Sequence, residues 1–490
     1  MGVIQRQGIK STIITYTGIF IGFLSLLVIQ PQLLSPEIIG LTRILYSFSF
    51  LVSTVVPLSI VNITTRFFPR FRSPEKKHHG YFGFMLVWLT AGSLLFLPIL
   101  WIFKSYFISI YTENSHLFSE YFIFVLPLTL VIASISIISN YLFSIFRPIL
   151  PAFAQEVFIR LLFILIIVFY AAGYLNLNQF VYSFIGTYIL QLIVLLVYVF
   201  KRGDISFRIN TNIFNKKVII EMLNYGWMVF LAGIASMAIK LLDTIVLGQF
   251  VSLALVGVYG IAAFIPTFIE APLNALDKVA NARIAYSWEK NDLENIKEIY
   301  YKSSRYLFLL GGFLFLMVTI NTPHLFQFLP FEFKSGIPVV GILSLSALFN
   351  LMTGSNNAII YTSNRFASGT IALVSITCIN LVLLYLLIPP YGIIGAAWAT
   401  CISSFLYNAF KYVYIWIRFK LQPFDKRTIF IAVSIALTYG TMQFVPLLEN
   451  VILNIVLHSL LVTLSFTVLI WFSRAADDLK QLLPFFKNKQ

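Results

Sequence analysis

Charged side chains stand inside stretches of the chain that are otherwise apolar. In AIKLLDTIVLG (residues 238–248), Lys240 and Asp243 lie three residues apart, and in another apolar stretch Glu156 precedes Arg160 by four. On a helix, both spacings put the two side chains on one face, where a cation and a carboxylate can pair. Because isolated charges are costly in apolar surroundings, each pair either fixes the packing of helices or takes part in binding a charged ligand.

The composition predicts an all-α integral membrane protein. The chain is 59% hydrophobic and 11% charged, whereas a soluble domain carries about 25% charged residues. Its apolar runs last about 20 residues, which fits helices better than the alternating strands of about 10 residues found in barrels. The two cysteines, Cys378 and Cys401, have no CxxC spacing, and His78 and His79 belong to a polar loop. We therefore expect no disulfide, no metal site and no cofactor.

The hydropathy predicts fourteen spans, and the basic residues predict their orientation. With the N-terminus in the cytoplasm, the inner segments hold 28 of the 34 Lys and Arg, the outer loops hold two, and four lie within spans. This asymmetry predicts that both termini are cytoplasmic. The net charge of +15 then faces anionic lipid head groups, not nucleic acid. The expected spans are 11–31, 38–62, 81–103, 119–145, 154–173, 178–200, 224–249, 253–276, 304–321, 337–361, 367–388, 392–417, 428–446 and 451–472.

The first six spans and the next six show signs of an internal repeat. LLSPEIIGLTRILYSF resembles FVSLALVGVYGIAAFI, which sets Gly40 on Gly257 at an offset of 217 residues, and a second match occurs at an offset of 218. Six is an even number, so two repeats of six spans would run in the same direction and be related by an axis along the membrane normal.

The repeat predicts two parallel six-helix lobes and an appendage. We expect an N-terminal lobe over 1–217, a C-terminal lobe over 218–420, and spans 13 and 14 with a cytoplasmic tail over 421–490. Pro57 and Pro272 interrupt spans at roughly corresponding places in the two lobes. Proline removes a helical hydrogen bond, so these two are either hinges or static kinks.

Three stretches resemble a known family of transporters. LDTIVLGQFVSLALVGVYGIAAFI (242–265) is similar to the start of the second half of polysaccharide transporters in the multidrug/oligosaccharidyl-lipid/polysaccharide exporter superfamily. LLIPPYGIIGAAWATCISS (386–404) is similar to the joint between their eleventh and twelfth helices, with a tyrosine-glycine turn followed by GAA. SPEIIGLTRILYSF (35–48) matches the entry into their second helix.

The resemblance implies a flippase of the bacterial cytoplasmic (inner) membrane. Such proteins move oligosaccharide units linked to undecaprenyl diphosphate, O-antigen units of lipopolysaccharide among them, from the inner to the outer leaflet by alternating access. The implied partners are the lipid-diphosphate-linked glycan, membrane lipids, a coupling ion (H⁺ or Na⁺) and proteins of polysaccharide assembly.

A diphosphate substrate gives the intramembrane charges a possible role. Arginine binds phosphate with two parallel hydrogen bonds and lysine acts as a point charge. We expect Arg43, Arg160 and Lys240 to supply positive charge to a hydrated cavity, with Asp243, Glu156 and Glu270 as charge partners or coupling groups.

The structural alternatives stay open for these charges. Arg43 can instead extend to the outer head groups, and for Lys411, near the inner end of span twelve, we expect such an extension to the inner ones.

Two other functions are weighed against the flippase. A multidrug extruder of the same superfamily would need an amphipathic pocket with few cations, and several deep basic residues speak against it. A membrane polysaccharide polymerase or glycosyltransferase would need sizeable outer loops, whereas the longest expected here are 104–118 and 322–336. We therefore expect a transporter and not an enzyme.

Overall fold

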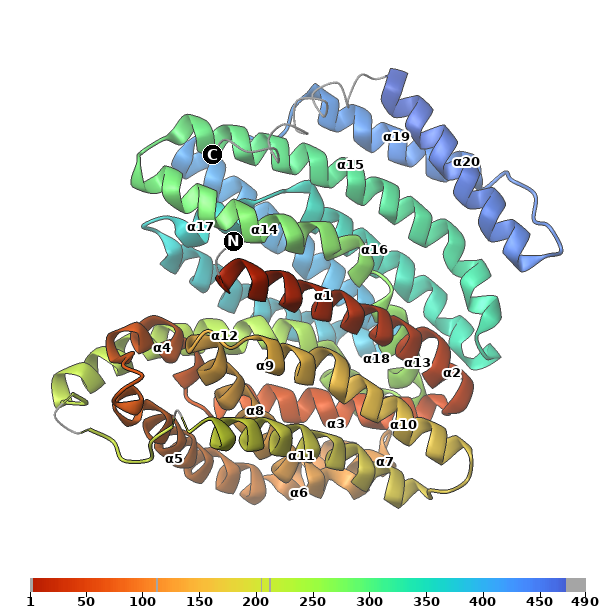
Figure 1. Ribbon diagram of the computed structural model, residues 1–490. Helices are drawn as coiled ribbons and strands as arrows, with labels where there is room; N and C mark the ends of the chain where they lie inside the picture. Colours follow the sequence, from red (N-terminus) through yellow and green to blue (C-terminus); the bar gives the residue numbers. More distant parts are fainter. Residues whose placement is uncertain (1–2, 112, 204, 211–212, 473–490) are drawn as a thin grey trace. The chain divides into compact units, whose positions relative to one another are not determined.

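The computed structural model describes residues 3–111, 113–203, 205–210 and 213–472, and the regular structure of this part of the chain consists of helices without strands (Figure 1). Internal contacts divide the chain into two compact units, residues 1–260 and residues 261–490, which we call the first and the second unit. The lobe boundary expected at residue 217 was derived from the internal sequence repeat, whereas the units are defined by contacts within the structure. That boundary therefore stays a prediction.

The first unit contains the helices up to α12 and the beginning of α13. Within it, α3 packs against α8 and α12, α8 against α11, and α10 against α11. Its helices are α1 (Val3–Phe23), α2 (Gln30–Leu33), α3 (Pro36–Val55), α4 (Ile60–Phe67), α5 (Tyr81–Ile102), α6 (Lys104–Tyr111), α7 (His116–Tyr121), α8 (Val125–Ser144), α9 (Ile149–Phe153), α10 (Ile159–Ala171), α11 (Leu177–Arg202), α12 (Lys216–Phe250) and α13 (Leu253–Phe264).

Shorter helical segments join several of these helices. Two of them are π-helical, Leu24–Ile29 between α1 and α2 and Ala154–Phe158 between α9 and α10. The 3-10 turns are Phe68–Phe71, Lys77–Gly80 and Phe122–Phe124 in the first unit, and Phe326–Phe328 and Phe331–Gly336 in the second.

The second unit is built around α15. This helix packs against α14, α16, α19 and α20, while α18 packs against α16 and α17. The helices of this unit are α14 (Thr267–Glu289), α15 (Leu293–Leu325), α16 (Ile337–Met352), α17 (Asn356–Thr362), α18 (Phe366–Phe419), α19 (Lys426–Met442) and α20 (Val451–Phe472).

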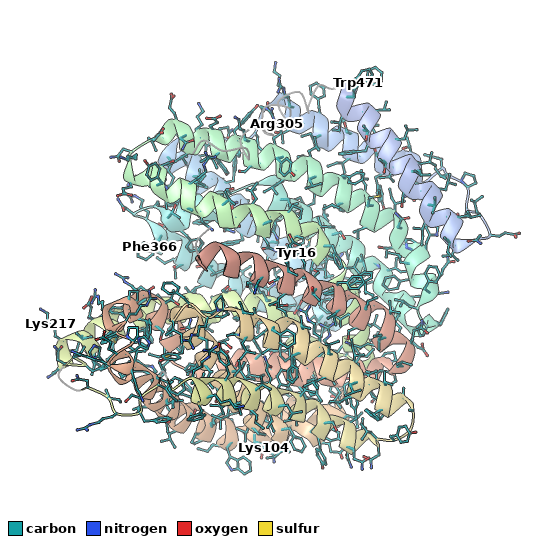
Figure 2. The ribbon with its side chains drawn as sticks, viewed as in Figure 1. Tyr16, Lys104, Lys217, Arg305, Phe366 and Trp471 are labelled. Atoms are coloured by element: carbon teal, nitrogen blue, oxygen red, sulfur yellow. The ribbon has the colours of Figure 1, made fainter. Side chains whose placement is uncertain are left out.

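Length and hydropathy confirm a multi-pass membrane protein. Eleven helices of the described residues are long and apolar enough to cross a membrane, or twelve if α13 and α14 form one bent span. The fourteen expected spans each coincide with helical structure. The two numbers differ because α18 joins two expected spans and α19 has only 17 residues. Large apolar side chains such as Tyr16 of α1 and Trp471 of α20 are well exposed (Figure 2), as a surface that faces lipid requires.

The joint inside α18 has the turn at Tyr391 and Gly392 that the family resemblance implies. Gly392 has φ 54° and ψ −131°, a conformation open to glycine alone. The two parts of α18 then run antiparallel, since Asn380 Nδ2 donates to Ser403 Oγ at 3.1 Å. A Cβ on Gly395 would collide with the carbonyl oxygen of Leu387, so glycine at this position allows the tight approach.

The two glycines matched by the repeat meet in space. Within the first unit, a Cβ on Gly40 of α3 would collide with the carbonyl oxygen of Leu253, and a Cβ on Gly257 of α13 would collide with that of Pro36. Pro36 and Leu253 are separated by the same 217 residues as the two glycines. The contact is therefore reciprocal, as a two-fold relation between the repeated segments requires.

The two expected proline hinges differ. At Pro57 the helix breaks, because α3 ends at Val55, α4 begins at Ile60, and Leu58 and Ser59 between them have positive φ angles of 47° and 61°.

Pro272, by contrast, lies inside the continuous helix α14. The bend in this region, 48° between α13 and α14, falls earlier, at Ile265 and Pro266. Pro266 immediately precedes α14 and begins the new helix instead of kinking it.

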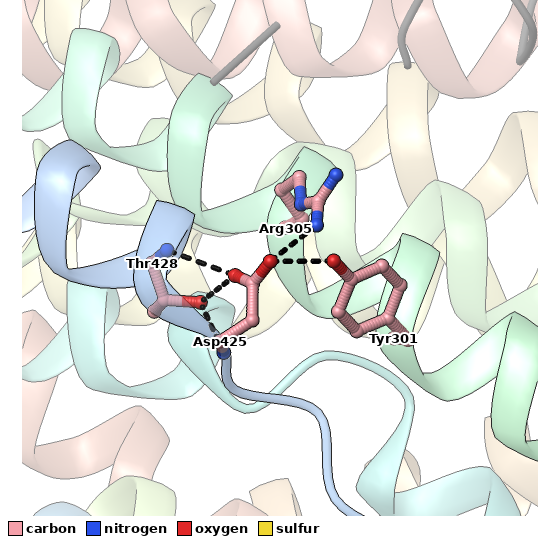
Figure 3. A network of polar contacts seen from close by, with 4 residues as sticks. All are labelled: Tyr301, Arg305, Asp425 and Thr428. Carbon is pink, nitrogen blue, oxygen red and sulfur yellow. Dashed lines mark hydrogen bonds and ion pairs between the residues drawn. The ribbon is translucent and has the colours of Figure 1, made fainter. Parts of the chain in front are cut away.

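Helices α19 and α20 lie side by side along α15 (Figure 1), and a polar cluster fastens the beginning of α19 (Figure 3). Asp425 is the N-cap of α19 and forms a capping box with Thr428. Its Oδ2 also accepts from Arg305 Nη2 at 2.7 Å and from the Tyr301 hydroxyl at 2.6 Å. One carboxylate thus both starts α19 and ties it to α15.

Candidate functional site

A cavity of about 520 Å³ lies within the first unit, between the π-helical segment after α1, α3, α8, α11 and the start of α10. Its volume falls within the range of about 300–1,000 Å³ typical of ligand pockets. The charged residues and amides that line it are Arg43, Glu156, Arg160, Gln30, Gln155 and Gln191.

The cavity brings together three residues that the sequence singled out: Arg43 from α3, Glu156 from the second π-helical segment, and Arg160 from α10. Both π-helical segments contribute to the wall, through Ser25 and Leu26 in the first and Gln155 and Glu156 in the second. A π-turn adds a residue to a helix and so rotates the side chains that follow, and such turns are frequent at functional sites.

The expected pair of Glu156 and Arg160 is confirmed. Arg160 Nη2 lies 3.1 Å from Glu156 Oε2, and Arg160 Nη1 donates to the carbonyl oxygen of Gly18 in α1. Two glycines of α1 make this approach possible, because a Cβ on Gly18 would lie 2.6 Å from Glu156 Cβ and one on Gly22 would lie 2.8 Å from Arg160 Nη1. The guanidinium of Arg160 therefore already binds Glu156 and the backbone of α1 and helps to hold α1 in place.

Arg43 is bonded differently. Arg43 lines the cavity, and its Nη2 is buried and has no hydrogen-bond partner among the described residues. Its positive charge is attracted by the Asp243 carboxylate. A buried donor without an acceptor costs free energy, so Arg43 is the residue of the cavity wall whose hydrogen bonding the described residues leave incomplete.

The expected pair of Lys240 and Asp243 does not form. Asp243 Oδ2 accepts from the Tyr259 hydroxyl at 2.7 Å, and its Oδ1 accepts from the backbone N–H of Thr244 at 2.7 Å. Lys240 is exposed, and it takes part in no ion pair of the described residues. The Asp243 carboxylate thus accepts a hydrogen bond from Tyr259 of the next helix, α13. The spacing of residues within one helix could not predict this contact.

Aromatic and amide side chains complete the cavity wall, and the sequence analysis missed them. The rings of Tyr46 and Tyr188 are stacked with centroids 5.9 Å apart, and Gln191 is buried. Gln30 donates to Ser25 at 3.1 Å. Glutamines within apolar helices could have indicated these wall residues in the sequence. An uncharged amide, like a charged group, needs hydrogen-bond partners inside a membrane.

Glu270 and Lys411 belong to the second unit. Asn350 Nδ2 donates to Glu270 Oε1 at 2.6 Å. Lys411 does not extend to the head groups as expected, because it is buried, donates to Asn357 Oδ1 at 3.0 Å and lies over the Tyr407 ring. An acceptor and an aromatic face inside the unit replace the water that the ammonium would otherwise seek.

No three His, Cys, Asp or Glu side chains come together to hold a metal ion within the described part of the chain.

Comparisons with solved structures show which proteins share this fold. The chain is similar to the lipid II flippase MurJ in an inward closed conformation, with a TM-score of 0.74, 15% identity, and coverage of 95% of this chain and 99% of that one. It is also similar to an inward-facing multidrug resistance MATE family transporter, with a TM-score of 0.64, 13% identity, and coverage of 86% and 95%.

Comparisons of sequence point the same way. A curated relative, the probable flippase AglR of Haloferax volcanii, is 29% identical over 193 residues. The match covers 37% of this chain and 38% of that protein, so the chain spans less than two-fifths of the relative's length. The family described as "Polysaccharide biosynthesis protein" matches residues 6–276. Because this match takes in more than half of the chain and the whole candidate cavity, the protein belongs to the polysaccharide biosynthesis protein family.

Proposed function

We propose that this protein is a flippase that moves lipid-diphosphate-linked oligosaccharides from the inner to the outer leaflet by alternating access. Membership in the polysaccharide biosynthesis family supports this function. So do the similarity to a probable flippase and the fold shared with a lipid II flippase. The protein acts as a transporter and not as an enzyme, and it serves the assembly of a polysaccharide such as an O-antigen.

The observation that carries the proposal is Arg43 in the cavity wall, with a buried Nη2 that has no hydrogen-bond partner among the described residues. A diphosphate head group brings several acceptor oxygens and negative charge, and arginine matches phosphate with two parallel hydrogen bonds. Arg160 adds positive charge but already holds Glu156 and Gly18. Arg43 is therefore the phosphate ligand, and Arg160 positions the wall against which the head group lies.

The remaining wall suits a sugar. Tyrosine hydroxyls and the amides of Gln30, Gln155 and Gln191 offer both donors and acceptors to the hydroxyls of a glycan. A cavity of about 520 Å³ accommodates a head group and its first sugars, while the undecaprenyl-type tail stays in the lipid. Lys240, on α12, is a further candidate cation along the path.

The setting follows from the same proposal. The protein resides in a bacterial cytoplasmic membrane with both termini in the cytoplasm, is driven by H⁺ or Na⁺, and hands its product to proteins of polysaccharide assembly.

A multidrug extruder is the second candidate, and the fold shared with a MATE family transporter favours it. Such a transporter binds cationic amphiphiles, for which a cavity with two arginines and one glutamate is electrostatically unfavourable. Transport of a cationic dye by the purified protein in liposomes, without flipping of a lipid-diphosphate glycan, would support the extruder over the flippase.

The test is depletion in the native host followed by leaflet-resolved analysis of lipid-linked glycans. Depletion should cause the glycan to accumulate on the inner leaflet, and the wild-type gene should reverse this. Arg43→Gln should fail to restore export at equal protein level, whereas the exposed Arg202→Gln at the end of α11 should restore it. An unchanged leaflet distribution on depletion would contradict the proposal.

A further inference from the structure

A second cavity, of about 600 Å³, lies within the second unit, where residues of α15, α16, α18, α19 and α20 form its wall. A water molecule takes up about 30 Å³ in the liquid, so this cavity has room for a ligand of many atoms. Among the described residues, no lysine, arginine, aspartate or glutamate lines it, in contrast to the cavity of Arg43. Because a buried charge needs a counter-charge, the wall favours an uncharged ligand.

Two histidines meet in the wall of this second cavity. His324, in the last turn of α15, and His458 of α20 are both buried, and their ring centroids lie 4.9 Å apart. Neither takes part in an ion pair of the described residues. A buried imidazolium without a carboxylate beside it is costly, so both rings are neutral here.

The surroundings of the two rings decide where their protons lie. His458 Nδ1 lies 2.9 Å from the carbonyl oxygen of Asn454. A carbonyl oxygen only accepts, so Nδ1 of His458 carries the proton and its Nε2 has a free lone pair. His324 Nδ1 is buried and has no partner among the described residues. A buried N–H without an acceptor is costly, so the proton of His324 lies on Nε2.

The two Nε2 atoms form a matched pair. Neither has a hydrogen-bond partner among the described residues, and neither is buried as His324 Nδ1 is. Since both rings line the cavity, these nitrogens face its interior. The wall thus presents an N–H donor on His324 beside a lone-pair acceptor on His458. A hydroxyl group donates and accepts at once, so it is the group that satisfies both.

The rest of the wall suits a sugar. The amides of Gln327 and Gln443 supply further donors and acceptors, and the rings of Trp398 and Tyr439 are well exposed. A sugar carries hydroxyl groups on its edges and C–H groups on its faces, and aromatic rings cover such apolar faces. A water molecule would satisfy the two histidines but would leave these rings without a partner.

We propose that this second cavity binds a neutral sugar, with a sugar hydroxyl bonded to His324 and His458. The predicted topology places the end of α15 and the connection between α19 and α20 on the outer side. The site therefore receives a sugar unit of the glycan after it has crossed the membrane and before it is released. This role in release rests on the proposed flippase function, whereas sugar binding itself does not.

Binding is tested by saturation-transfer NMR on the full-length protein in nanodiscs, with maltotriose, chitotriose and mannotriose as probes. At least one trisaccharide should bind. His324→Phe and His458→Phe keep a ring but remove its nitrogens, so each should weaken binding about five- to tenfold, the effect of losing one hydrogen bond. His116→Phe, at an exposed histidine of the first unit, should leave binding unchanged. No binding of any probe, or equal binding by all three variants, would overturn the proposal.

Gly341 of α16 provides a variant that leaves the histidines untouched. It lines the second cavity, and a Cβ there would meet no atom within 4 Å. Gly341→Leu therefore fills the cavity without crowding the wall, and leucine is also the better helix former. It should abolish trisaccharide binding while the midpoint of thermal unfolding stays equal or rises.

Two controls locate the site. Gly186→Leu, at another open glycine, should retain trisaccharide binding, and so should Arg43→Gln, because Arg43 lines the cavity of the first unit. Binding that is lost in Arg43→Gln and kept in Gly341→Leu would overturn the proposal, since the sugar would then occupy the first cavity.

The source of the sugar is tested with the same trisaccharides attached to diacylglycerol. Binding of both forms shows that the sugar suffices, and binding of the attached form alone shows that the site takes a glycolipid; either result supports a sugar site. Binding of diacylglycerol without sugar that Gly341→Leu blocks would overturn it, because the cavity would then hold lipid.

The role in release is tested by flipping of a lipid-diphosphate glycan in liposomes. Gly341→Leu should slow flipping relative to Gly186→Leu, and equal rates would overturn this role. If the trisaccharides bind but the wild type flips no glycan, the proposed function fails while the sugar site stands.

Discussion

Gly18 of α1 holds the arginine side of the cavity together. A Cβ there would lie 2.6 Å from both the Cβ and the carbonyl oxygen of Glu156, whereas ordinary contacts begin near 3.4 Å. Gly18→Ala therefore has to push α1 away from the second π-helical segment by about 0.8 Å, the difference between these distances, because backbone atoms of a packed interior give way only together. The shift also stretches the bond from Arg160 to the carbonyl of Gly18.

The steric cost of the added methyl group can be compared with the stability gained because alanine has a higher helix propensity than glycine. Alanine is about 1 kcal/mol better than glycine in a helix interior, while forcing an extra methyl group into a packed site costs about 1–3 kcal/mol. Gly18→Ala should thus lower stability on balance. Gly22→Ala should cost less, because its Cβ would meet the movable end of Arg160.

Gly186 of α11 is the matched control. A Cβ there meets no atom within 4 Å, so Gly186→Ala should leave stability unchanged or raise it. The measurement is the midpoint of thermal unfolding in nanodiscs, with binding of a lipid-diphosphate glycan as the second readout. The expected order of stability is Gly186→Ala, then Gly22→Ala, then Gly18→Ala. Equal midpoints for Gly18→Ala and Gly186→Ala would refute the close packing of α1 on the cavity wall.

Three further predictions follow from other contacts. Asp425→Ala removes the N-cap of α19 and the hydrogen bonds that join α19 to α15. Amide hydrogen exchange in α19 should accelerate by a factor that corresponds to about 0.5–2 kcal/mol, the cost of losing an N-cap. Unchanged exchange would contradict the role of Asp425. A cysteine at Glu75 should react only from the cytoplasmic side and one at Glu113 only from outside, and labelling of both from one side would reverse the topology. Because Lys240 and Asp243 are not paired, the effects of Lys240→Ala and Asp243→Asn on the free energy of unfolding should add within about 0.3–0.5 kcal/mol. A larger interaction energy in the double-mutant cycle would show that the two side chains do pair.

The sequence predicted the helices well because hydropathy and basic residues respond to the membrane itself. A run such as 178–200 is apolar because lipid surrounds it, and this does not depend on which helix lies beside it. The break near Gly392 was also predicted, since the expected spans end at 388 and begin again at 392, and the resemblance implied the turn itself.

The partners of the charges were less predictable, because tertiary packing selects them. Glu156 and Arg160 pair within one turn, and their spacing revealed it. Asp243 is instead satisfied by Tyr259, sixteen residues away along the chain, and Lys411 by Asn357 and Tyr407. Spacing within a helix cannot report such contacts.

One signal in the sequence was available and overlooked. Gly18 and Gly22 form a G-x-x-x-G pattern in α1, and small residues at this spacing allow helices in membranes to approach closely. This pattern predicts a close neighbour for α1. It does not predict that the neighbour is the π-helical turn of Glu156, because the extra residue of a π-turn has no local sequence signature.

The central claim, that Arg43 binds the diphosphate of a lipid-linked glycan during flipping, is tested most directly in liposomes with purified protein. Flipping would be measured for a glycan on lipid diphosphate and for the same glycan on lipid monophosphate, with wild type, Arg43→Gln and Arg202→Gln. Wild type and Arg202→Gln should flip the diphosphate faster than the monophosphate, and Arg43→Gln should lose both this preference and most of the rate. Flipping of the diphosphate by Arg43→Gln at the wild-type rate would contradict the account.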